Sequence, residues 1–110
     1  MDIREIASLV EQETGISWND MRLDTRKREI VFARQLVMTM ARKYTELPLR
    51  LIAEPFSRDH ATVLHAEKTV NNLCETDNDV HERYRRINNN CWHESEVNPI
   101  EIMCNNCIQL

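Results

Sequence analysis

The chain has 110 residues, a single glycine and 29% charged residues. This length suits one small domain with one core, and the scarcity of glycine argues against an all-β fold and against a glycine-rich phosphate loop. It has no apolar run long enough to span a membrane, and its acidic, amphipathic first residues do not resemble a signal peptide, so we expect a cytoplasmic protein.

The net charge of −4 is unevenly distributed along the chain. Residues 22–68 carry ten basic and six acidic side chains, whereas the segments before and after them each have a net charge of −4. A phosphate backbone responds to the local field more than to the total charge. The basic central segment is therefore compatible with nucleic-acid binding.

Helical spacing of apolar residues dominates the first half of the chain. A helix is predicted over 2–13, with Asp2 as its cap and Gly15 after its end. One further turn is expected within 16–21, followed by a long helix over 24–47. The apolar stripe of the long helix is Ile30, Ala33, Val37, Met40, Ala41 and Tyr44, and its other face carries Arg34, Gln35, Arg42 and Lys43.

Three more helices are expected after Pro48. A short amphipathic helix over 49–56 leads through a turn, capped by Ser57 or Asp59, into a helix over 59–75. The buried stripe of that helix is predicted to be Val63, Ala66, Val70 and Leu73. A last helix runs to about residue 90, where we place the boundary between a domain of residues 1–90 and a tail of residues 91–110. The predicted fold class is all-α.

The stretch FSRDHATVLHAEK at 56–68 places polar side chains at the start of a helix with an apolar back. A short helix, a turn and such a helix form a helix-turn-helix, whose second helix enters the major groove by its first turn. Arg58 suits guanine or phosphate, and Asp59 suits cytosine N4 or a capping role. His60 suits a base edge, Ala61 a thymine methyl group and Thr62 a phosphate.

The segment RDHATVLHA at 58–66 closely resembles the signature of the DNA-binding domain of the bacterial replication initiator DnaA, and the resemblance covers about residues 2–90. It implies a helical bundle of the DnaA C-terminal, Trp-repressor-like type, with a helix-turn-helix and a basic loop. It also implies binding to double-stranded DNA at a nine-base-pair box related to TTATCCACA.

The resemblance further implies which residues contact DNA. Arg26, next to Lys27, takes the place of the arginine that enters the minor groove. Phosphate contacts are implied for Arg34, Gln35 and Arg42, and a contact from the turn near Leu49. Base contacts in the major groove are implied for Arg58, Asp59, His60 and Ala61, with Thr62 and His65 in support.

The chain departs from the family pattern at three points. Ser57 alone precedes Arg58, where the family has two glycines, and Ala61 replaces a threonine. These two changes leave the exact box sequence open. The 110 residues contain no GxxxxGK[ST] motif, so we expect no nucleotide binding and no ATP hydrolysis.

Histidines and cysteines raise alternatives to DNA binding. His60 and His65 lie five residues apart, about 140° around a helix, so they do not share a metal as an i,i+4 pair does, and we expect no catalysis, cofactor or metal there. His65 is equally compatible with a half-buried structural role. Cys91, His93, Cys104 and Cys107 leave a zinc site and free thiols as open alternatives.

Two functions fit these residues. The first is sequence-specific binding to a DnaA-box-like site, which regulates replication initiation or transcription without ATPase activity. The second is a protein-interaction adaptor on the same fold, with the tail as its partner surface. Salt dependence separates them, because phosphate binding weakens steeply with salt. We expect no enzyme activity and no membrane partner.

Overall fold

A computed structural model of the chain describes residues 2–94, the last three by their backbone alone. Within this range the chain forms helices and no strand, which confirms the all-α prediction. None of these helices is long and apolar enough to cross a membrane. The elements are α1 (Ile3–Thr14), α2 (Trp18–Met21), α3 (Arg28–Tyr44), α4 (Leu49–Ala53), the 3-10 turn η1 (Glu54–Phe56), α5 (His60–Thr76) and α6 (Asn78–Glu94).

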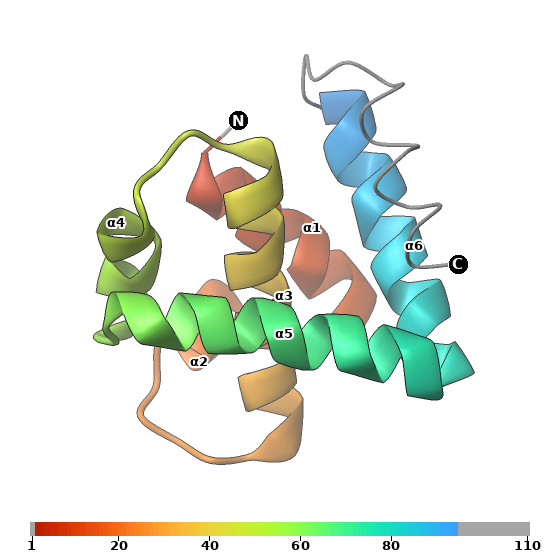
Figure 1. Cartoon of the computed structure of the whole chain (residues 1–110), viewed down its shortest axis with the longest axis horizontal. Coiled ribbons are helices and arrows are strands. Elements are labelled where there is room, and N and C mark those ends of the chain that lie inside the picture. The colour runs from red at the N-terminus through yellow and green to blue at the C-terminus, as the bar shows by residue number, and fades with distance from the viewer. Residues whose placement is uncertain (1, 95–110) are drawn as a thin grey trace.

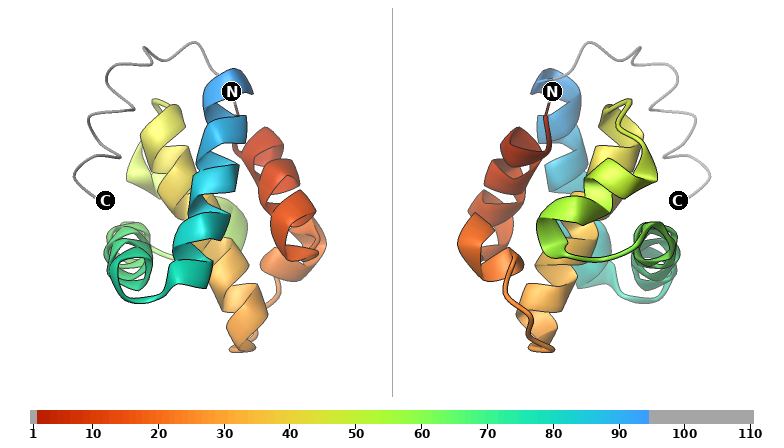
Figure 2. Two further views of the ribbon diagram at one scale, coloured as in Figure 1. Left: turned by 90° about the vertical axis from the view of Figure 1, so that its right-hand side faces the viewer. Right: turned by 90° about the vertical axis from the view of Figure 1, so that its left-hand side faces the viewer.

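Helix α3 is the centre of the bundle, and each of the other α-helices contacts it. Helix α5 crosses α3 on one side, and α1 packs on the opposite side (Figures 1 and 2). Burial therefore extends beyond the predicted stripe, of which Ile30 is only half-buried. The residues of α3 that are at most 1% exposed are Ala33, Leu36, Val37, Met38, Met40 and Ala41.

Both ends of α1 are formed as the sequence predicts. The carboxylate of Asp2 accepts a hydrogen bond from the backbone N–H of Glu5 at 2.9 Å, and so caps the helix. Gly15 ends it in the left-handed conformation, with φ 77°, and its N–H donates to the carbonyl of Glu11. These local signals need no tertiary contact, which explains why spacing and residue type alone predicted them.

Helix α3 is shorter than the predicted range of 24–47. It begins at Arg28, and Arg26 and Lys27 lie in the preceding loop. At the other end Thr45 is extended, and its hydroxyl and N–H both donate to the carbonyl of Ala41. Arg26 and Lys27 are therefore part of a basic loop, as the family resemblance implies.

Helix α6 is longer than predicted, because it continues past Asn90 to Glu94. Cys91 is fully buried in the core, so the expected start of a tail at residue 91 falls inside this helix. Lys43 is half-buried rather than on an exposed face, and its Nζ donates to Asn88 Oδ1 at 3.0 Å. The hydroxyl of Tyr44 donates to the same oxygen, which attaches α6 to α3.

The two cysteines whose side chains the structure describes, Cys74 and Cys91, are buried thiols. Burial is the main cause that raises the pKa of Cys74, to about 11, so this thiol stays protonated at neutral pH. The side chain of His93 and the residues Cys104 and Cys107 lie outside the described part. The alternative of a zinc site that includes them is not tested by this structure.

Candidate nucleic-acid interface

The first turn of α5 presents polar side chains to solvent and buries its back. Asp59 is the N-cap, and its carboxylate accepts from the N–H and the hydroxyl of Thr62, each at 3.0 Å. Arg58, His60 and Ala61 are exposed. On the opposite side of the helix Val63, Ala66 and Val70 are buried, while Leu73 is only half-buried. This is the geometry expected of a recognition helix.

The capping role predicted for Asp59 has an electrostatic consequence. The N–H of Thr62 first, and then its hydroxyl, lower the pKa of the Asp59 carboxyl, because both hydrogen bonds favour the ionised form. His60 adds a smaller contribution in the same direction. The ionised cap is thus the form that the folded protein prefers.

We expect the stabilisation by Asp59 to be lost in acid. Because the folded-state pKa is lowered, the contribution is fully present above the unfolded-state pKa, roughly 3.9, and disappears as pH falls through the folded-state value. Asp59→Asn keeps a capping oxygen but does not titrate. Thermal melts between pH 6 and pH 3 should show that the melting temperature of the variant rises relative to that of the wild type as pH falls. A difference that is constant with pH would contradict this role.

The turn before α5 depends on Ser57. Among the non-glycine residues of the described range 2–94, Ser57 is the one with a positive φ, at φ 55° and ψ 42°. Its N–H donates to the carbonyl of Glu54, and the next N–H, of Arg58, donates to the carbonyl of Ala53. A single left-handed residue thus forms the turn between η1 and α5. A side chain in this conformation carries a steric cost that glycine lacks.

Ser57→Gly is therefore expected to stabilise the protein. Relief of the left-handed strain outweighs the greater freedom of glycine in the unfolded chain, and the net gain should be about 0.5–1 kcal/mol. Chemical denaturation, followed by circular dichroism, measures this difference in the free energy of unfolding. Ser57→Val is the matched opposite, because a β-branched residue resists positive φ. A loss of stability in the glycine variant would show that the turn does not require this conformation.

Arg34 is buried, which corrects the prediction that it lies on an exposed face. Its side chain is 6% exposed. Its Nε donates to the carbonyl of Met21 at 2.9 Å, and its Nη2 donates to those of Leu23 and Thr25 at 3.0 and 3.3 Å. Burial and the nearby Arg58 lower its pKa, and Asp24 acts in the opposite direction. Arg34 therefore fastens the loop that carries Arg26.

The same loop is attached to the helix-turn-helix. The Nε of Arg22 donates to the carbonyl of Pro55 at 3.1 Å, and Arg58 Nη2 lies 3.3 Å from Asp24 Oδ1. The loop of residues 22–27 therefore lies beside the start of α5, at the lower left of Figure 1. Sequence reasoning missed both contacts, because their partners are 33 and 34 residues apart and no local pattern joins them.

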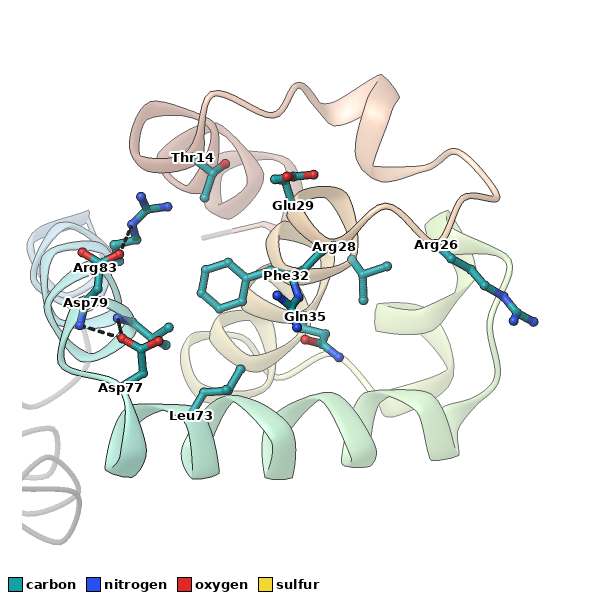
Figure 3. A pocket seen from close by; sticks show the side chains of 12 residues that line it. Thr14, Arg26, Arg28, Glu29, Phe32, Gln35, Leu73, Asp77, Asp79 and Arg83 are labelled. Atoms are coloured by element: carbon teal, nitrogen blue, oxygen red, sulfur yellow. Dashed lines mark hydrogen bonds and ion pairs between the residues drawn. The ribbon is translucent and has the colours of Figure 1, made fainter.

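Gln35 lines a groove between α3, α5 and α6, with a volume of about 690 Å³. Arg26 and Arg28 lie along the same groove, and Figure 3 shows Arg26 pointing away from its centre. Phe32 forms part of the apolar lining. Arg28 directly follows Arg26 and Lys27 in the sequence and continues their run of basic side chains. It is exposed at the first turn of α3 and is a further candidate for a phosphate contact.

Arg42 lies near the other end of α3, 14 residues after Arg28, which corresponds to about 21 Å along a helix. Its Nε is 2.7 Å from Glu67 Oε2 on α5, and the two side chains are 43% and 37% exposed. His65 is exposed, which argues against a half-buried structural role. Leu49 and Thr62 are half-buried.

The predicted residues thus divide into distinct groups. Arg26, Lys27, Arg58, His60 and Ala61 are exposed on the loop and the adjoining start of α5. Gln35 and Arg42 lie on α3, along its length. Arg34 lies beneath the loop instead of on the surface.

The model of the bacterial dnaA protein helix-turn-helix family matches residues 3–70, from α1 into α5. The chain belongs to this family. The chromosomal replication initiator protein DnaA of Flavobacterium psychrophilum is 57% identical over 54 residues, which are 48% of this chain and 11% of that protein. The protein of the same name from Gloeobacter violaceus is 40% identical over 85 residues, which are 76% of this chain and 19% of that protein. The chain therefore spans less than a fifth of either DnaA relative.

Proposed function

We propose that this DnaA-type helix-turn-helix binds double-stranded DNA sequence-specifically, at a site related to TTATCCACA, and so regulates replication initiation or transcription. The observation that carries the proposal is the first turn of α5, which exposes Arg58, His60 and Ala61 while its back lies in the core. A helix held in this way presents hydrogen-bonding groups to base edges in the major groove.

The loop and α3 would supply the remaining contacts. Exposed Arg26 and Lys27 lie on the loop that Arg22 and Asp24 attach to the helix-turn-helix, which supports a contact of this loop with the groove next to the one that α5 would enter. Gln35 and Arg42, which lie along α3, would contact phosphates of the adjoining backbone. Phosphate contacts fix register and orientation, and base contacts confer sequence preference. The function is binding without chemistry.

Fluorescence anisotropy tests this proposal. The full chain is titrated with a duplex that contains TTATCCACA and with a scrambled duplex, each at low and near-physiological salt. We expect preference for the box at both salt concentrations. The logarithm of the binding constant should fall linearly with the logarithm of the salt concentration, with a slope of about −0.9 for each phosphate neutralised. Equal, salt-labile binding to both duplexes would contradict box recognition. Binding to neither would contradict DNA binding and favour the adaptor alternative.

A further inference from the structure

The side chain of Asp24 contacts a predicted base-reading residue. Its carboxylate lies two residues before Arg26 in the chain, and its Oδ1 is 3.3 Å from Arg58 Nη2. The Asp24 side chain is 99% exposed and that of Arg58 is 36% exposed. One carboxylate therefore connects the loop of the predicted minor-groove arginine to the predicted major-groove arginine. The hydrogen bonds by which Arg22 and Arg34 hold the same loop are donated to backbone carbonyls.

We propose that Asp24 is a positioning residue that orients Arg58 for base contact and so contributes to sequence discrimination. This inference rests on the proposed DNA-binding function. A free arginine side chain occupies many rotamers, and ordering it on binding opposes affinity. The ion pair with Asp24 restricts Arg58 to fewer rotamers before DNA binds. Because the guanidinium has five N–H donors and the pair uses one edge of it, other donors remain for a guanine or a phosphate.

The exposure of the pair allows the exchange that binding requires. Exposed ion pairs contribute little to stability, so Arg58 can shift toward a base without a large loss. The carboxylate also repels the phosphates of any duplex, which lowers the affinity for box and scrambled DNA alike. Asp24 is therefore expected to favour the box over other sequences through its contact with Arg58.

Glu67 offers a matched comparison in the same molecule. It pairs with Arg42, which is a predicted phosphate contact and not a base contact, and this pair is also exposed. Removal of the Glu67 charge releases Arg42 for any duplex, because phosphates are the same in every sequence. Glu67→Gln and Asp24→Asn therefore remove the same charge from the interface but should differ in their effect on discrimination.

The experiment compares wild type, Asp24→Asn and Glu67→Gln by anisotropy with the box and scrambled duplexes. We expect Asp24→Asn to lower the ratio of box to scrambled affinity by about twofold to tenfold, the factor associated with ordering one long side chain. Glu67→Gln should raise both affinities alike and leave the ratio unchanged. Glu11→Gln controls for net charge, because exposed Glu11 belongs to α1 and this helix lies on the far side of α3 from α5 (Figure 2).

A second background tests whether Asp24 acts through Arg58. In Arg58→Ala, the further change Asp24→Asn should leave the ratio unchanged, and circular dichroism confirms that each variant is folded. An unchanged ratio in Asp24→Asn alone, or an equal fall in Glu67→Gln, would overturn the inference while leaving the proposed function intact. A wild-type protein that did not discriminate the duplexes would overturn the proposed function and this inference together.

Discussion

Arg58→Ala and His60→Ala are each expected to weaken binding to the box duplex by about 1–3 kcal/mol and to reduce discrimination against the scrambled duplex. Both residues are exposed at the start of α5, and the proposed binding mode brings their polar groups to base edges. The two variants should differ on scrambled DNA. Arg58→Ala also removes a positive charge and weakens non-specific binding, whereas His60→Ala leaves it nearly unchanged.

A histidine on another helix provides the control. His81 lies on α6, so His81→Ala makes the same chemical change away from the start of α5 and should bind both duplexes like the wild type. Anisotropy at one fixed salt concentration is sufficient for this comparison. Unchanged box binding in both Arg58→Ala and His60→Ala would show that the first turn of α5 does not read bases.

Arg34→Ala is expected to affect the fold more than any substitution of an exposed arginine in this interface. It removes three hydrogen bonds from a buried guanidinium to the carbonyls of Met21, Leu23 and Thr25. The loss should be about 2–3 kcal/mol of the free energy of unfolding, because hydrogen bonds from charged groups are strong and their partners become unsatisfied. The loop should also lose its anchor, so binding to both duplexes should weaken.

Two variants separate this structural role from a phosphate contact. Arg34→Lys should restore little stability, because one ammonium group does not reproduce the fork that reaches all three carbonyls. Arg42→Ala should change stability by no more than about 1 kcal/mol and should reduce the salt slope by about 1. If Arg34→Ala kept wild-type stability and only the salt slope fell, the side chain would act as a phosphate contact instead of an anchor.

Local features of the fold were predictable from the sequence because each depends on a few neighbouring residues. The caps Asp2 and Asp59 and the terminating Gly15 each act within one helical turn. The signature around Arg58 and His60 likewise indicated the recognition helix, because polar residues at its start and apolar residues on its back are adjacent in sequence. The family match confirmed this reading of the helix-turn-helix.

The errors arose where tertiary contacts decide the structure. Periodicity assumes one buried face, but α3 is surrounded by the other helices, so Arg34 and Lys43 are covered although their spacing indicated exposure. Cys91 was assigned to a tail because the last residues lack clear periodicity, yet it packs in the core on α6. The pair of Asp24 and Arg58 joins segments that no local pattern relates.

The most direct test of the interface is an NMR titration of the ¹⁵N-labelled chain with the TTATCCACA duplex. We expect amide shift changes concentrated in residues 22–27 and 57–65, with smaller changes near Gln35 and Arg42 and almost none on the exposed face of α1. Changes confined to α1 and α6, with none at the start of α5, would contradict the proposed recognition surface.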